Sequence, residues 1–402
     1  MKRRRASSDA SDVSSVLRLA ELHGSRGDLK KQKSASWTRL LQYLTPRYLV
    51  LGGGLGRSAG NDRLPEEIDK FFSVKWVSKS KALVASKCGR LRLVEPMGLA
   101  LDKPVYIPLP PSPSSTVCAI PGGGIHGLAV DKSHNFLATG GVEHNPESIG
   151  LLRLPCMTPL SATGPVHTDW VFNVDWLSSD RLISVSRDGS IVTWKCDSDK
   201  LLPIMSQRNA HKSTDSELAR IRDCAVFSDN SEVSSTIITL SPNASPCNRA
   251  IIWKISEGSY VPLRKYEFPP SVPVRSRLAL SPCVCTDLDS ESIFALGVSD
   301  EVLLFDYRCP KTDFICKAKS IDATQGPIRS ISIRDSNLVT CTGATGRLFF
   351  YDTRKPSHVL DKYFTAPCAI FAHEWDETGT AVLIAGGGLH LDSNDSFVTA
   401  FM

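Results

Sequence analysis

Short segments in which apolar and polar residues alternate recur along most of the chain. Three of them are closely alike and read FSVKW at 72–76, FNVDW at 172–176 and FAHEW at 371–375. Alternation with a period of two places one set of side chains on each face of a β-strand. The pattern therefore predicts strands, and the likeness of the three segments indicates an internal repeat.

Seven such segments start at intervals of 42 to 54 residues, and their first residues are Phe72, His126, Phe172, Arg222, Arg275, Arg329 and Phe371. This interval is close to the length of the four-stranded units that build WD-repeat propellers. In the third unit a second strand at 182–186, a turn at 187–190 and a third strand at 191–194 follow. The turn reads RDGS, and Asp-Gly in a two-strand turn is a specific hairpin signal. The sequence therefore predicts an all-β fold, a seven-bladed WD-repeat β-propeller.

The two ends of the chain complete this picture. The third strand of the seventh unit ends at Phe401, so a fourth strand is missing from that unit, and residues 48–51 are expected to supply it. Residues 1–33 contain too few apolar side chains to form a core and are expected to be a disordered basic tail. Residues 34–46 are expected to form a short amphipathic helix that either packs on its own domain or docks on a partner. Its apolar positions are Trp37, Leu40, Leu41 and Leu44. The propeller is expected to occupy residues 47–402.

Composition and motifs narrow the function classes. A net charge of +5 is too small to imply nucleic-acid binding by itself. The basic start runs into Ser and Asp, and no run of about 18 apolar residues exists, so neither a secretory signal nor a membrane span is predicted. Cytoplasmic and nuclear residence are expected, and most of the twelve cysteines are then core thiols. The sequence has no C-x-x-C pair, and no metal or cofactor is expected.

Two common catalytic motifs are missing from the sequence. It contains no H-E-x-x-H and no Walker loop, and no enzymatic activity is expected. His167, Ser184, Asp188 and Trp194 could suggest a catalytic triad, but they occupy positions where WD repeats tie strands together through buried hydrogen bonds. A structural role is predicted for them.

Basic residues fall at positions that the propeller topology brings to one face. The entry to the first strand and the turn between the second and third strands lie at the same end of a four-stranded meander. The basic residues at or beside these positions are Lys87, His126, Arg187, Arg220, Arg222, Arg275 and Arg329. Cations around a low-dielectric channel attract anions, and arginine suits bidentate carboxylate contacts. An anion-binding mouth is predicted; the alternative is solvated loop charges paired with nearby acids.

Two third strands end in the pattern aromatic-Asp-x-Arg, which reads FDYR at 305–308 and YDTR at 351–354. The residues concerned are Phe305, Asp306, Arg308, Tyr351, Asp352 and Arg354. Either the acid and the arginine pair locally to close the strand end, or the box is an exposed docking signature. Both interpretations stay open at this point.

These boxes resemble those of the substrate receptors of cullin-4 ubiquitin ligases, and further segments resemble the family of the twelfth cullin-4-associated factor. The similar segments are GIH at 124–126, LATGG at 137–141, DWVF at 169–172, SRDGS at 186–190 and IRS at 328–330. The resemblance covers about residues 70–390. It implies a substrate-recognition subunit whose N-terminal helix and boxes bind the ligase's triple-propeller adaptor.

The same resemblance implies the kind of substrate. The family's basic pocket accepts chains that end in two glutamates, and the matching positions here are Lys87, His126, Arg187, Arg220, Arg222 and Arg329. Other hypotheses remain beside it: a WD-repeat scaffold that binds anionic peptides or histone tails without a ligase, and a nucleic-acid binder, whose affinity should fall steeply with salt. No membrane partner is expected.

Overall fold

The structure is a computed structural model. It describes residues 46–52, 70–78, 80–87, 89, 91–94, 124–141, 149–162, 166–197, 200–211, 219–227, 235–242, 248–256, 258–268, 284–286, 293–298, 301–309, 316–319, 328–335, 338–352, 364–366, 368–376, 379–388 and 396–401. The regular elements in these ranges are strands. Within them, no helix has the length and apolar character needed to cross a lipid bilayer. The predicted tail and helix lie outside the described residues, apart from Pro46.

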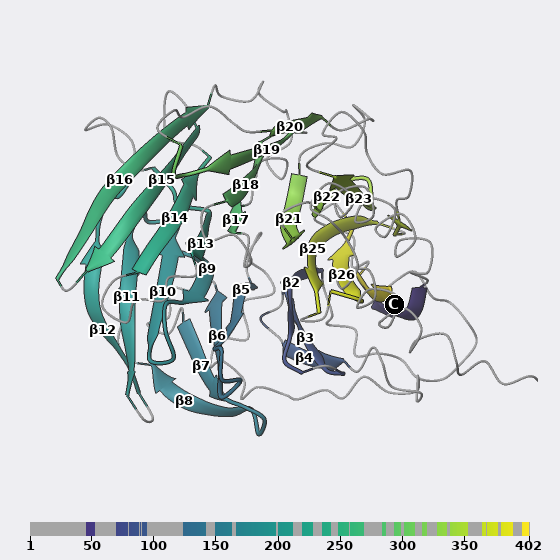
Figure 1. The fold of residues 1–402 in the computed structure, drawn as a ribbon. Helices are drawn as coiled ribbons and strands as arrows, with labels where there is room; N and C mark the ends of the chain where they lie inside the picture. The colour runs from purple at the N-terminus through teal and green to yellow at the C-terminus, as the bar shows by residue number, and fades with distance from the viewer. Residues whose placement is uncertain are drawn as a thin grey trace, which may run out of the picture.

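Antiparallel strands form seven blades around a central axis (Figure 1). The first strands surround the centre and are β2 (Phe71–Trp76), β5 (Ile125–Val130), β9 (Val171–Trp176), β13 (Asp223–Phe227), β17 (Val284–Thr286), β21 (Ile328–Asp335) and β25 (Ala369–Trp375). The second strands are β3 (Ala82–Ser86), β6 (Phe136–Gly141), β10 (Arg181–Ser186), β14 (Ser235–Ser241), β18 (Ile293–Val298), β22 (Leu338–Gly343) and β26 (Val382–Gly387). This arrangement confirms the predicted WD-repeat propeller.

The third strands are β4 (Leu91–Val94), β7 (Ile149–Arg153), β11 (Ile191–Asp197), β15 (Asn248–Ser256), β19 (Glu301–Asp306), β23 (Arg347–Asp352) and β27 (Ser396–Phe401). The outer strands are β8 (Thr158–Ala162), β12 (Lys200–Gln207), β16 (Ser259–Phe268), β20 (Cys316–Lys319), β24 (Phe364–Thr365) and β1 (Pro46–Gly52). The first blade has three described strands, and the second and third blades join through a short parallel pairing of β8 with β12.

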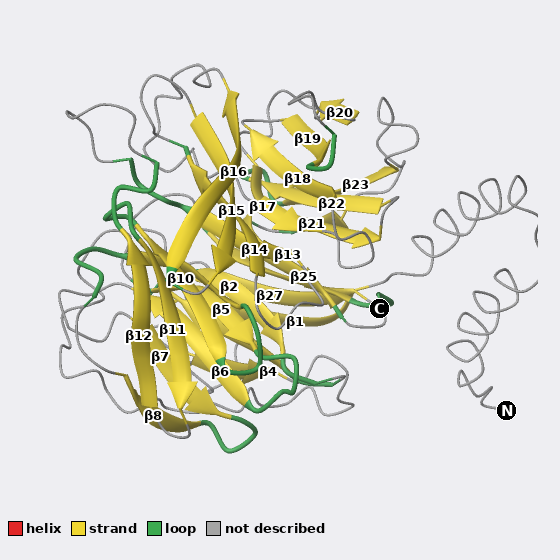
Figure 2. Cartoon of the chain, turned by 60° about the vertical axis from the view of Figure 1, so that its left-hand side comes forward, coloured by secondary structure: helices red, strands yellow, loops and turns green. Residues whose placement is uncertain are grey.

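The seventh blade is closed by the N-terminal strand, as the sequence predicts. β1 pairs antiparallel with β27, with Tyr48 opposite Ala400 and Leu51 opposite Phe397, and Figure 2 shows the two strands side by side. The strand begins at Pro46, where the predicted helix ends. Because β1 and β27 share one sheet, the ring closes through backbone hydrogen bonds.

The fifth repeat start stays a prediction. The sequence places it at Arg275, which lies outside the described residues. The first described strand of the fifth blade is β17, Val284–Thr286, which pairs with β18 through Val284 and Leu296.

The repeated tryptophans tie each first strand to the preceding blade. Trp76 Nε1 donates to Glu374 O at 3.3 Å, and Trp176 Nε1 donates to Ala129 O at 3.1 Å. Glu374 also accepts from the backbone of Trp76 at 2.8 Å and pairs with Lys75, whose pKa its charge raises. These contacts explain why the segments that begin three of the blades look alike.

Apolar side chains fill the space between neighbouring blades. Trp194 and Leu201 of the third blade belong to a buried cluster with Leu151 of the second, whereas Ile191 packs with Trp253 of the fourth. A sheet that is covered on both faces by its neighbours needs apolar residues on both faces, which accounts for the nearly continuous burial of strands such as β10 and β22.

Candidate functional site

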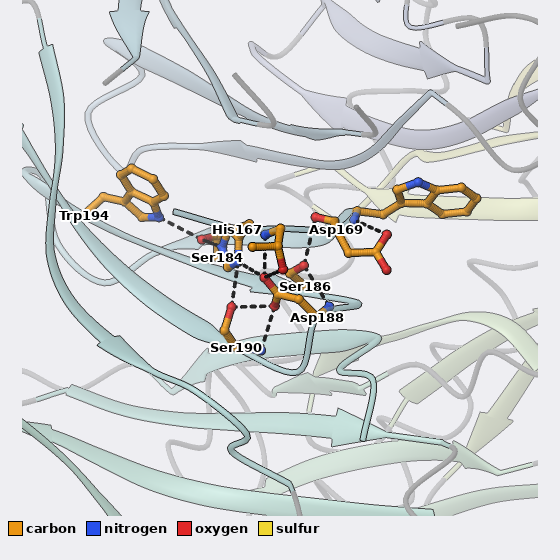
Figure 3. Close-up of polar contacts among 9 residues, drawn as sticks. His167, Asp169, Ser184, Ser186, Asp188, Ser190 and Trp194 are labelled. Atoms are coloured by element: carbon orange, nitrogen blue, oxygen red, sulfur yellow. Dashed lines mark hydrogen bonds and ion pairs between the residues drawn. The ribbon is translucent and has the colours of Figure 1, made fainter. Parts of the chain in front are cut away.

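A buried chain of hydrogen bonds links the strands of the third blade, as predicted for its four polar residues (Figure 3). Trp194 Nε1 donates to Ser184 Oγ at 2.7 Å, and Ser184 Oγ lies 2.7 Å from His167 Nε2. His167 Nδ1 lies 3.4 Å from Asp188 Oδ2. His167 and Ser184 are fully enclosed, so their geometry serves structure and leaves no room for a substrate.

Asp188 fixes the loop that leads into β9. Its carboxylate accepts from the backbone N–H of Thr168 at 2.8 Å and from the backbone N–H of Ser190 at 2.8 Å. Burial alone would raise the pKa of Asp188, but the hydrogen bond and charge of His167, together with these donors, lower it well below its usual range. The carboxylate therefore stays ionised and holds the loop 167–170 against the turn 187–190.

That clamp positions Arg187. The backbone N–H of Arg187 donates to Trp170 O at 2.8 Å, and its guanidinium carbon lies 4.8 Å from the centre of the Trp170 ring. Arg187 Nε also lies 3.6 Å from Asp169 Oδ2. The side chain is thus held between a ring and a carboxylate, both from the loop that the buried hydrogen bonds secure.

Aromatic rings connect the basic residues of different blades into one row. Phe72 stacks on His126 with 4.7 Å between ring centres, and it meets Phe371 edge-on at 5.7 Å. His126 in turn meets Phe172 at 5.4 Å. The guanidinium of Arg222 lies 4.0 Å over Phe172. On the far side, the guanidinium of Arg329 lies 5.6 Å over Phe371.

The structure brings most of the predicted basic positions together. Arg222, His126 and Arg329 belong to the row of rings just described, and Arg187 joins it through Trp170, whose ring centre lies 6.3 Å from that of His126. The segment before β13 lies against the turn of the third blade, where Ile221 N donates to Ser186 O at 3.2 Å. The exposed Arg220 comes directly before this contact in the chain.

Lys87 follows β3 and is more enclosed than the other basic positions. Its backbone touches Gly124, where the close approach and a φ of +109° leave no room for a Cβ atom. Gly124 lies two residues before His126, so Lys87 borders the same mouth. The residue is only 8% exposed, in contrast to the open cation that the turn position suggests.

Sequence reasoning missed the rings that hold these cations. The sequence pattern marks Phe72, Phe172 and Phe371 only as strand starts and does not single out Trp170. A signal was present: the strand-entry position carries an aromatic residue in some blades and a basic residue in others, so neighbouring blades pair a ring with a cation. Such an alternation is visible only when the repeats are read as a column.

The arrangement suits an anionic ligand. A ring beneath a guanidinium restricts its motion, and guanidinium groups bind carboxylates and phosphates through their N–H groups. Several cations gathered on one face of the propeller also add their fields. In the part of the chain that the structure describes, no group of three or more His, Cys, Asp or Glu side chains could hold a metal ion.

The two aromatic-Asp-x-Arg boxes lie at the opposite end of the blades and differ from each other. In the fifth blade, Arg308 Nη2 contacts Asp306 Oδ2 at 2.7 Å, while the arginine side chain stays 68% exposed. Local pairing and exposure are therefore both present in this box, and Phe305 is buried. In the sixth blade Tyr351 and Asp352 are buried, and Arg354 lies outside the described residues.

Comparison with known proteins identifies the family. A sequence model described as the DDB1- and CUL4-associated factor 12 beta propeller matches residues 64–373. The chain belongs to this family. The matched residues lie over most of the stretch, about residues 70–390, in which the sequence resembles these receptors.

Solved structures with similar folds are WD-repeat propellers. The structure of U3-55K is 13% identical with a TM-score of 0.60, covering 88% of this chain and 99% of that one. The WD40 propeller domain of Doa1 is 14% identical with a TM-score of 0.58, covering 89% and 97%. The WD40 repeats of RRP9 are 13% identical with a TM-score of 0.61, covering 89% and 100%. At these identities the likeness establishes the fold alone.

Proposed function

We propose that this chain is the substrate-recognition subunit of a cullin-4 ubiquitin ligase, with its mouth binding substrate C-termini that end in two glutamates. Membership of the DDB1- and CUL4-associated factor 12 family supports the ligase assignment. The chain would dock on the DDB1 adaptor through its exposed Arg308 box and through the predicted helix over 34–46. It binds and presents substrates, and the chemistry belongs to other subunits.

One observation carries the proposal for the ligand: three arginines from three blades lie over aromatic rings at one mouth. A chain ending in two glutamates brings three carboxylates within one dipeptide, which matches this set of cations. A hydrogen bond to a charged group is worth about 1.5 to 3 kcal/mol, so removing one arginine should cost ten-fold or more in affinity. Basic peptides such as histone tails would be repelled by the same mouth.

Fluorescence polarisation with the full chain tests the ligand. A peptide ending in two glutamates is compared with the same peptide amidated at its C-terminus. We expect binding of the free acid, at least ten-fold weaker binding of the amide, and at least ten-fold weaker binding of the acid by Arg222→Ala. Arg153→Ala, which removes an exposed arginine at the other end of the second blade, is the matched control and should bind as the wild type does.

Equal affinity for the acid and the amide would contradict the degron assignment, and so would an unchanged affinity of Arg222→Ala. A salt dependence as steep as that of nucleic-acid binders, with DNA competing for the mouth, would favour the nucleic-acid hypothesis instead.

A further inference from the structure

The propeller carries a paired apolar surface on the outside of two neighbouring blades. Among the described residues, four large apolar side chains are exposed: Leu202 (38%), Ile204 (52%), Val261 (45%) and Leu263 (51%). The first two lie on β12 and the others on β16, which form the outer edge of the third and fourth blades (left side of Figure 1). Scattered exposed apolar residues need no explanation, but these are not scattered.

The four residues occupy equivalent positions in the two blades. Leu202 pairs with Lys195, which follows Trp194, and Val261 pairs with Lys254, which follows Trp253. The next residue in each outer strand is a proline, an arrangement that edge strands tolerate.

Directly after each proline the pairing shifts by one residue, so that Ile204 and Leu263 are left out of the ladder as bulge residues. A bulge redirects a side chain, and here it turns the two most exposed apolar residues outward at the same place in both blades. The two outer strands thus expose apolar side chains by the same local structure, a proline followed by a β-bulge.

This surface lies at the end of the blades away from the basic mouth. The last pairs of the two hairpins are Asp197 with Lys200 and Ser256 with Ser259, close to the exposed residues. The mouth is at the other end of the same strands, beside the turn 187–190. A partner could therefore cover the outer surface while a ligand occupies the mouth.

The surface continues into the Arg308 box of the fifth blade. Arg264, next to Leu263, donates a hydrogen bond to Cys309 O, and the Tyr307 ring lies 4.9 Å from Phe227 of the fourth blade. Phe305, the last residue but one of β19, pairs with the second strand of its blade as Trp253 of β15 does, and Arg308 follows three residues later. The exposed guanidinium and the apolar side chains form one rim across three consecutive blades.

We infer that this rim, consisting of Leu202, Ile204, Val261, Leu263 and Arg308, is a docking surface for the DDB1 adaptor. The inference rests on the proposed function and extends the adaptor contact from the box to the outer strands of the third and fourth blades. Exposed Lys195 and Lys254 stand beside the apolar positions, so the complementary surface is apolar with carboxylates around it. A permanently bound partner would also cover two outer strands whose exposed edges are prone to aggregation.

Binding of purified DDB1 to the immobilised full chain, measured by biolayer interferometry, tests the rim. Ile204→Glu and Leu263→Glu place a charge on an exposed position and should each weaken DDB1 binding at least ten-fold, with a larger loss in the double variant. Ser206→Glu adds the same charge to an exposed position of β12 nearer the mouth and is the matched control, expected within two-fold of the wild type. Unchanged affinity for the twin-glutamate peptide shows that each variant is folded.

The outcomes separate the inference from the proposed function. If the double variant binds DDB1 as tightly as the wild type does, while Arg308→Ala binds it more weakly, the rim is overturned and the ligase assignment stands. A wild type that does not bind DDB1 would overturn both. If light scattering shows a dimer of this chain that Leu263→Glu dissociates, and DDB1 binding is unchanged, the surface belongs to a second copy and the inference is wrong.

Discussion

The third and fourth blades solve the same packing problem with opposite charges. Both contain a histidine, a hydroxyl and a tryptophan in a buried chain: His167, Ser184 and Trp194 in one, and His211, Thr239 and Trp253 in the other, with Thr239 Oγ1 2.7 Å from His211 Nε2 and 2.8 Å from Trp253 Nε1. In the third blade an acid, Asp188, completes the chain. In the fourth blade Arg249 stands where the third has Ser190, and it donates to His211 O at 2.6 Å.

The cations of the fourth blade act on its buried histidine. Burial and then the charges of Arg249 and Lys265 lower the pKa of His211 to about 3, so it is a neutral hydrogen-bonding group. In the third blade the acid also binds the loop that carries Asp169 and Trp170, the two contacts of Arg187. The acid therefore does more than stabilise a blade: it fixes the part of the mouth where Arg187 is held in place.

Removing the acid should have the largest effect. Asp188→Ala leaves several buried donors without an acceptor, and we expect the free energy of unfolding to fall by about 4 kcal/mol. Denaturant unfolding measures this. Asp180→Ala, an exposed acid of the same blade, should change the free energy by less than about 0.5 kcal/mol. If both variants change the free energy of unfolding by a similarly small amount, Asp188 does not have the special role in the third blade that we assign to it.

Removing the Thr239 hydroxyl of the fourth blade should lower stability almost as much, although no acid among the described residues contacts it. Thr239→Val keeps the shape but leaves Trp253 Nε1 and His211 Nε2 without their shared partner, and we expect a loss of about 3 kcal/mol. Thr239→Ser keeps the hydroxyl and should retain most of the stability. If valine and serine destabilise equally, packing rather than hydrogen bonding holds this blade.

The pH dependence of stability should reveal the neutral histidine. The folded pKa of His211 is about 3, below the ordinary value of about 6.5, so between these pH values the unfolded chain takes up a proton that the folded chain does not. Stability therefore falls as the pH falls through this window, by about 2 kcal/mol for this residue between pH 7 and pH 5.

Urea unfolding of the wild type and of His211→Gln at several pH values measures that contribution. His373, whose pKa burial also lowers to about 3, contributes in the same direction, so the variant should retain part of the slope. Parallel curves for the two proteins would mean that His211 is not held neutral.

Repetition in the sequence determined the fold and the structural role of the buried polar chain. Strand alternation, the spacing of the starts and the turn at 187–190 define blades because each is a local pattern that backbone pairing enforces. The same logic predicted that residues 48–51 close the ring. The predicted fifth repeat start at Arg275 stays a prediction, because that residue lies outside the described ranges.

Only the tertiary structure decided which side chains share a surface. Arg222 lies over a ring from the preceding blade, and Arg329 over a ring from the following one, because the circular arrangement brings together residues that are distant in sequence. The outward turn of Ile204 and Leu263 depends on a one-residue shift in pairing, which two strands must form together. Alternation along one strand carries no information about its neighbours' register, and so the contents of the mouth and the rim could be read only from the assembled blades.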